Sequence, residues 1–221
     1  MKKNLFLSII LISASGIHAQ GNFSKIDLYI GGGSQKYRGD LGNGFNFKNS
    51  TWRGGFTGSV VYNLNKSFAI GVTGYIGDLG FCQSDAVAGK EVHMEDRCDG
   101  CIGRIGLGNI SSRMVSGGFL LKYKLNNNYI LREDFIVKPY VFAGISANRI
   151  SDLMEMNCVN TGNYFSINSG LGIMYSINKK ISIGYNLTFG YFTSDEIDYM
   201  IHHHSNDMYM QNNILIGFHL F

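Results

Sequence analysis

Proline and charge are both scarce in this chain. Its 221 residues include one proline, and Asp, Glu, Lys and Arg together make up 16% of them. The formal net charge is only +3, and no run of Lys or Arg interleaves with aromatic residues, as nucleic-acid binding would need. Beyond residue 20, no apolar stretch approaches the about 20 residues of a membrane-spanning helix. These scarcities argue against a nucleic-acid-binding protein and against an α-helical membrane protein.

Glycine and aromatic residues are abundant instead. The chain has 29 Gly, 13 Tyr and 15 Phe residues. Such a composition is unusual for a soluble secreted domain. It suits strands that face lipid on one side and a crowded interior on the other.

The first twenty residues have the pattern of an export signal. Residues 1–3 read Met-Lys-Lys, and residues 5–12 form a short apolar region rich in Ile and Leu. Ala19 precedes Gln20 at a position suited to signal-peptidase cleavage, and no Cys follows it to carry a lipid anchor. We therefore expect residues 1–19 to be a cleaved signal peptide and residues 20–221 to form one exported domain.

Apolar and polar residues alternate along the mature chain, which indicates strands with two different faces. The pattern is clearest near residue 185. One face there carries Ile181, Ile183, Tyr185, Leu187, Phe189 and Tyr191. The other carries Ser182, Gly184, Asn186, Thr188 and Gly190. The first face suits hydrocarbon, and the second suits a tightly packed polar interior.

Eight such segments can be counted, each long enough for a tilted membrane strand. They cover residues 25–34, 52–64, 67–79, 112–125, 135–147, 163–177, 180–192 and 208–221. Short connections alternate with the long ones at 35–51, 80–111, 148–162 and 193–207, as in outer-membrane barrels with periplasmic turns and extracellular loops. Backbone groups in lipid must all be paired, so the strands must close. The sequence predicts an all-β membrane protein, an antiparallel up-and-down transmembrane β-barrel of eight strands with both mature termini in the periplasm. A soluble β-sandwich or lipocalin-like barrel would not place Ile, Leu and Tyr outside every strand.

Three stretches resemble a known family. Residues 37–42 read Tyr-Arg-Gly-Asp-Leu-Gly, which is similar to a Tyr-x-Gly-Asp-Leu signature of outer-membrane barrels of the Bacteroidota. Residues 121–129 and 138–144 resemble two further stretches of the N-terminal barrel of OmpA-like proteins in that phylum. OmpA-like proteins usually carry a peptidoglycan-binding domain after the barrel. Here the last predicted strand ends at Phe221, so we expect this chain to carry no cell-wall tether.

Four charged residues are expected to face the barrel interior: Asp27, Arg53, Lys122 and Lys124. The interior of an eight-stranded barrel is just wide enough to be filled by side chains. Charges buried there must be paired. We expect an internal salt-bridge network, and the alternative is an ion pathway.

The four cysteines fall in predicted surface loops: Cys82, Cys98, Cys101 and Cys158. An oxidising, exported location favours disulfides. The three possible pairings remain open, and each complete pairing joins the loops 80–111 and 148–162 through Cys158. The Cys-x-x-Cys spacing at 98–101 also suits zinc binding or thiol exchange, although no second such motif accompanies it.

One stretch suggests an enzyme. Residues 203–206 read His-His-Ser-Asn, which resembles the His-x-Ser-Asn motif of outer-membrane lipid A deacylases. The resemblance implies Ser205 as nucleophile and His203 as its base. However, Asp207 stands where that motif has a small residue, and no downstream Glu orients the base. The histidines at 202–204, with His93 and Asp207, would hold a metal only if their loops met, so we expect a solvated loop without metal or cofactor.

The sequence therefore favours a non-enzymatic structural or interaction protein of the outer membrane. We expect an accessory subunit of a larger complex for secretion, assembly or uptake. Its expected partners are outer-membrane lipid and other outer-membrane proteins, and no nucleic acid. The alternatives are a lipid A deacylase-like hydrolase and a small pore.

Overall fold

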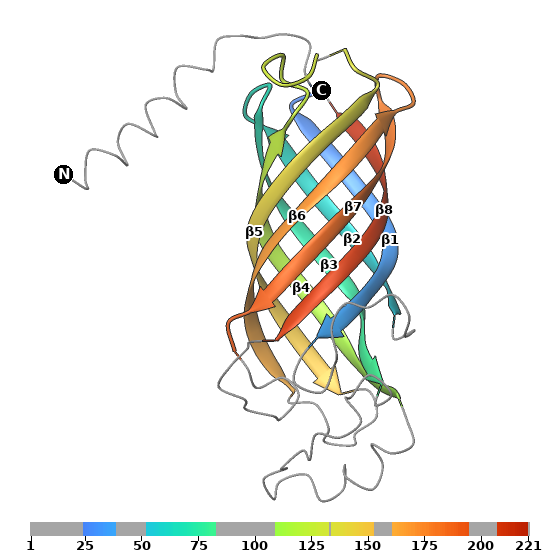
Figure 1. Ribbon diagram of the computed structural model, residues 1–221, viewed down its shortest axis with the longest axis vertical. Helices are drawn as coiled ribbons and strands as arrows, with labels where there is room; N and C mark the ends of the chain where they lie inside the picture. Colours follow the sequence, from blue (N-terminus) through green and yellow to red (C-terminus); the bar gives the residue numbers. More distant parts are fainter. Residues whose placement is uncertain are drawn as a thin grey trace, which may run out of the picture.

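A computed structural model describes residues 24–38, 52–82, 109–132, 134–152, 161–194 and 207–220. Within these ranges eight antiparallel strands follow one another around a closed barrel, and β1 pairs with β8 to complete it (Figure 1). The strands are β1 (Ile26–Arg38), β2 (Arg53–Asn63), β3 (Phe68–Cys82), β4 (Asn109–Lys124), β5 (Val137–Asp152), β6 (Gly162–Ser176), β7 (Ile181–Phe192) and β8 (Met208–Leu220). The predicted eight-stranded up-and-down barrel is confirmed. No helix in the described ranges is long and apolar enough to cross a membrane.

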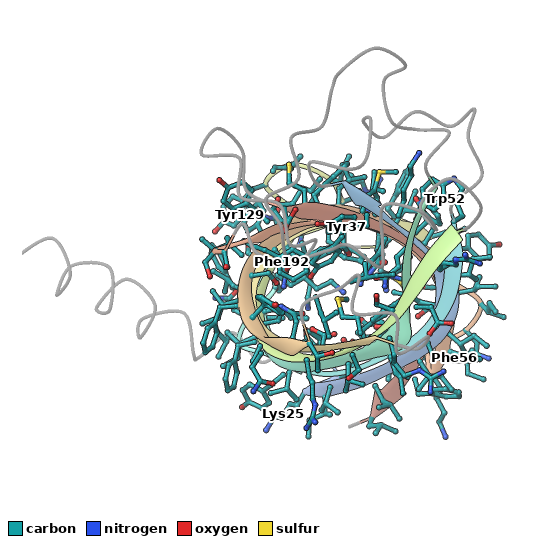
Figure 2. All side chains as sticks on the ribbon, turned by 90° about the horizontal axis from the view of Figure 1, so that it is seen from below. Lys25, Tyr37, Trp52, Phe56, Tyr129 and Phe192 are labelled. Carbon is teal, nitrogen blue, oxygen red and sulfur yellow. The ribbon has the colours of Figure 1, made fainter. Side chains whose placement is uncertain are left out.

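The alternation of the sequence becomes the two faces of the barrel wall. Outward side chains such as Phe56, Phe119 and Phe165 are 73%, 68% and 67% exposed. Inward neighbours on the same sheet, such as Tyr140 and Tyr209, are buried. Figure 2 shows Phe56 outside the ring of strands. A wall with this much exposed apolar surface is stable in hydrocarbon and not in water.

Several strands run further than the alternation predicted. β3 continues to Cys82 and β4 begins at Asn109, and these two residues are paired. Likewise β1 reaches Arg38 and β5 reaches Asp152, so the starts of the loops predicted at 35–51, 80–111 and 148–162 are strand. The reason is that ladder hydrogen bonds join backbone groups and continue where the side-chain pattern stops. Cys82 therefore ends a strand and was wrongly placed in a loop.

The three short connections use asparagine side chains to form their turns. The side-chain oxygen of Asn65 accepts hydrogen bonds from the backbone N–H groups two and three residues on, at 2.8 and 2.7 Å. Asn178 and Asn127 do the same in their own turns. Asn128 has a φ of 68°, which Asn tolerates better than most residues. These three turns lie at the end of the barrel that carries the C-terminus, here called the turn end (Figure 1).

Candidate functional site

The lumen is filled at two levels by apolar and aromatic side chains. The turn-end cluster consists of Tyr29, Val61, Ala69, Tyr140, Met174 and Leu215. The far-end cluster consists of Tyr37, Tyr75, Leu79, Met114, Ile150, Tyr164, Phe192 and Tyr209. Figure 2 shows Tyr37 and Phe192 inside the ring of strands. Such filling matches the narrow interior that eight strands enclose.

A cavity of about 80 Å³ with a mixed polar and apolar lining lies between the two clusters. Its apolar lining includes Tyr29, Tyr140 and Leu215 from the turn-end cluster and Tyr75 and Tyr209 from the far-end cluster. Its polar lining includes Thr57, Ser59, Thr73, Ser116, Asn168, Asn186, Thr188, Gln211 and Asn213, together with Lys122. A buried water needs roughly 10–15 Å³ on this measure and two to four polar partners, so the cavity has room for several waters.

A polar group at the turn end joins the strands that close the barrel. We call it the seam cluster, and it comprises Asp27 of β1, Asn63 of β2, Ser182 of β7 and His219 of β8. Asp27 lies 2.7 Å from His219 Nδ1 and accepts a hydrogen bond from Asn63 at 2.8 Å. His219 Nε2 lies 3.0 Å from Ser182 Oγ. Four strands, including the first and the last, are thus connected by side chains as well as by backbone.

Lys122 is buried between two aromatic rings. Its ammonium nitrogen lies 3.7 Å from the centre of the Tyr140 ring and 4.5 Å from that of Tyr29. Ring faces stabilise a cation at such distances. The same nitrogen lies 3.4 Å from the Tyr29 hydroxyl, which donates to Asp27 at 3.2 Å. Lys122 and Asp27 are therefore connected through Tyr29.

The four charged residues singled out from the sequence divide into two groups. Asp27 and Lys122 are buried and belong to one network, and Lys124 lies half-buried towards the same end. Arg53 is half-buried on the inner face at the opposite end of β2. The direct partner of Asp27 is His219, which the sequence reasoning missed. His219 alternates with Phe218 and Leu220 and could have been assigned to the inner face from that pattern.

A second polar network lies nearer the far end, on β5, β6 and β8. Ser146 and Ser166 are 2.8 Å apart through their hydroxyl oxygens, and Asn168 donates to Ser146 at 2.8 Å. Asn148 donates to Ser166 at 2.9 Å, and the Tyr209 hydroxyl donates to Asn168 at 2.7 Å. Satisfied buried networks of this kind fix one arrangement of side chains.

The seam cluster contains serine, histidine and aspartate in the order of a hydrolytic triad. A nucleophile must be open to its substrate, yet Ser182 is only 1% exposed and does not line the lumen cavity. A Cβ added to Gly217 would come within 2.5 Å of its hydroxyl oxygen, so no space is left above it. We therefore assign these contacts to the structure of the barrel rather than to catalysis.

Most of the loop candidates lie outside the described residues. These are Cys98, Cys101, Cys158, His203 and Ser205, and nothing is described of the Cys82 side chain. The disulfide and hydrolase hypotheses therefore stay predictions. Asp207 is described: it is buried and accepts a hydrogen bond from the Tyr37 hydroxyl. In the part of the chain that the structure describes, no three His, Cys, Asp or Glu side chains gather as metal ligands.

The outer wall of β1–β5 contains an open apolar groove of about 810 Å³, here called the wall groove. It is lined by Ile26, Val60, Tyr62, Ile70, Gly71, Val72, Phe119, Leu120, Leu121, Ala143, Gly144 and Ile145. Beside it, four small outward residues stand in register on successive strands: Gly58, Gly74, Gly117 and Ala147. We call these four the small-residue band. A Cβ on Gly117 would meet nothing within 4 Å, and on Gly58 or Gly74 nothing within 3.7 Å.

These features define a transmembrane β-barrel with a filled lumen. Residues 5–220 match the family model described as the outer membrane protein beta-barrel domain. The chain belongs to this family, which places it in the bacterial outer membrane. The predicted OmpA-like resemblance is thus supported at the level of an outer-membrane barrel, while the assignment to the Bacteroidota stays a prediction.

The first of three similar solved structures supports the fold. Neisserial surface protein A is 13% identical with a TM-score of 0.57, and the match covers 89% of this chain and 98% of that one. Ail of Yersinia pestis, in complex with the heparin analogue sucrose octasulfate, is 12% identical over 87% and 96%, with a TM-score of 0.48. The N-terminal barrel of Pseudomonas aeruginosa OprF is 12% identical over 88% and 97%, with a TM-score of 0.44. Among the curated proteins, none matches this sequence.

Proposed function

We propose that this chain is a non-enzymatic structural and interaction protein of the outer membrane. It serves as an accessory subunit of a larger complex for secretion, assembly or uptake. The observation that carries the proposal is the wall groove with the small-residue band beside it, on the outer face of β1–β5. The occupant of this surface is the membrane-embedded wall of another protein.

Small residues on a lipid-facing surface allow backbones to approach closely, and interfaces between transmembrane helices are enriched in them for this reason. The packing of this chain does not require the glycines of the band, because a side chain at Gly58, Gly74 or Gly117 would have open space. Lipid tails adapt to a wall of any shape, so contact with lipid does not require small residues at these positions. A second protein surface does require small residues there, because its side chains pack at fixed positions.

The size of the patch suits a protein partner. Four strands at about 4.8 Å spacing and four outward rows about 6.8 Å apart give roughly 500 Å² of flat wall. Side chains that project from the wall add accessible area to this figure. The flat wall alone is therefore more than half of the about 800 Å² that each partner contributes to a typical specific interface.

The filled lumen supports an interaction role over a pore. Tyr29, Tyr140 and Lys122 pack together at one level, and Phe192 and Tyr209 at another, with ring centres 5.1 Å apart. In the proposed orientation the tight turns and both mature termini face the periplasm, and the long loops face outward. Short periplasmic turns and longer extracellular loops are usual in such barrels.

The experiment is affinity purification of the tagged chain from native membranes in mild detergent, followed by mass spectrometry. We expect stoichiometric co-purification of another outer-membrane protein. Gly117→Phe should abolish it, while Ile214→Phe, which adds the same ring to the outer face of β8, should leave it unchanged. Heat-modifiable migration in gels must show that both variants still fold. A wild-type barrel that runs alone at monomer mass would overturn the proposal.

A further inference from the structure

We propose that the outer face of β4 and β5, at the end of the barrel opposite the turn end, binds a phosphate group through Arg113 and Arg149. The position of the two side chains assigns this phosphate to the headgroup of a membrane lipid. The site is independent of the proposed interaction role, because neither arginine lines the wall groove.

The two arginines are neighbours on the outer wall. Val115 of β4 is paired with Arg149 of β5. Arg113 is paired with Ser151, two residues further along each strand, so the arginines stand diagonally across the two strands. Diagonal neighbours are about 7–8 Å apart, within reach of long side chains. Both guanidinium groups can therefore contact one anion.

Both guanidinium groups have unused donors. Arg149 is exposed and makes no hydrogen bond or ion pair with another described residue. Arg113 meets Asp78 through Nε alone, at 3.5 Å, and its side chain is 51% exposed. A guanidinium group has five N–H donors in a planar fork that matches the oxygens of a phosphate. Asp78 offsets one of the two positive charges, and the other remains for a ligand.

Exposed positive charge is confined to this part of the wall. Among the strand residues whose side chains the structure describes, Arg113 and Arg149 are the only exposed Lys or Arg. At the same end of β6, β7 and β8, the outward positions hold Asn163, Tyr191 and Met208, which carry no charge. Arginines that only marked the edge of the membrane would be distributed around the barrel. Their concentration on two neighbouring strands favours a single anion as the reason.

The level of the two arginines along the barrel points to a lipid headgroup. Towards the turn end, the same wall is apolar, with Val115 46% and Ile145 60% exposed. On the neighbouring strand β6, Phe165 is 67% exposed near the same end as the arginines. Exposed aromatic residues gather where hydrocarbon meets the headgroups. A charge at this boundary is costly unless it is paired, and phosphate is the anionic group that lipid headgroups offer to arginine.

Native mass spectrometry of the refolded full chain, in an uncharged detergent, tests the site. The probes are a phosphatidic acid and a diacylglycerol with the same acyl chains, which lacks the phosphate. We expect the chain to retain phosphatidic acid and to lose diacylglycerol. Arg149→Gln should weaken phosphatidic acid binding about tenfold, because it removes charge-assisted hydrogen bonds to the phosphate. Equal retention of the two lipids by the wild-type chain would overturn the proposal.

Arg132→Gln is the matched control. Arg132 is an exposed arginine at the turn end, where it pairs with Asp134 at 2.8 Å, so the same substitution removes the same charge elsewhere. We expect phosphatidic acid binding to be unchanged in this variant. Heat-modifiable migration must show that both variants fold. Equal losses in Arg149→Gln and Arg132→Gln would indicate a general attraction to positive charge and would overturn the site.

Inorganic phosphate distinguishes the two possible sources of the ligand. Added at the same concentration as the lipid, it should leave phosphatidic acid bound, because the acyl chains of the lipid also contact the apolar wall. Release of the lipid by inorganic phosphate would overturn its assignment to a lipid headgroup.

Discussion

The glycines of the inner face and those of the outer face have opposite surroundings. A Cβ added to Gly190 would collide with the Tyr209 ring, and one added to Gly172 would collide with the Tyr140 ring. On the outer face, the same addition to Gly74 or Gly117 meets open space. Gly190 and Gly172 are therefore explained by packing within this chain, because each leaves room for a tyrosine from the neighbouring strand. The outer ones need a reason outside it, which the proposed partner supplies.

The largest expected effect tests this contrast directly. Gly190→Val should destabilise the barrel by about 3 kcal/mol, near the upper end of what overpacking costs, because the Tyr209 ring must move away from its hydrogen bond with Asn168. Gly117→Val should leave stability within about 0.5 kcal/mol. Urea unfolding in lipid vesicles, followed by tryptophan fluorescence, measures both. Similar losses in the two variants would contradict the comparison of the faces.

A smaller effect is expected at the seam cluster. His219→Phe removes the closest partner of the Asp27 carboxylate and should cost about 1.5–3 kcal/mol, the range for hydrogen bonds to charged groups. Ser182→Ala removes only a neutral contact with the same ring and should cost about 1 kcal/mol. Unfolding midpoints in the same vesicles would rank the two. The reverse order would show that Asp27 is held chiefly by Asn63 and Tyr29.

On the outer face, the loss of the polar contact between Tyr185 and Asn212 should matter less. The Tyr185 hydroxyl donates to the side-chain oxygen of Asn212 on the neighbouring strand, at the lipid-facing surface. Hydrogen bonds between transmembrane helices average about 0.6 kcal/mol, and we expect a similar cost of about that size for Tyr185→Phe. A double-mutant cycle with Asn212→Ala isolates the pair. A coupling energy above about 2 kcal/mol would mean that this contact is as important as those of the lumen.

The smallest effect is expected at the exposed ion pair between Arg113 and Asp78. The two groups are 3.5 Å apart on the outer face, and their side chains are 51% and 35% exposed. Exposed pairs contribute about 0.2–1 kcal/mol, less in salt. Arg113→Ala should therefore shift the unfolding midpoint only slightly, and less still at high ionic strength. A large, salt-insensitive loss would indicate a contact other than this pair.

The strand count, the closed topology and the assignment of residues to faces could all be predicted from the alternation. Ile183 and Tyr185 were assigned outward and Asn186 inward, as the structure has them. The strand ends near Arg38, Cys82 and Asp152 could not be predicted, because backbone pairing there continues without a side-chain pattern. Asp27 and Lys122 were expected on the inner face, but their contacts depend on the register of distant strands.

The sequence alone determined that this chain forms a barrel, because a period of two fixes which residues face lipid and every backbone group in lipid must be paired. Only the tertiary structure decided which interior groups meet. The pairing of β1 with β8 brings Asp27 to His219, 192 residues apart, and the curvature of the sheet places Lys122 between Tyr29 and Tyr140. It also aligned Gly58, Gly74 and Gly117 into one band. Register between strands sets such contacts. The alternation within each strand excludes slips of one residue, and the geometry of the turns decides among the remaining registers.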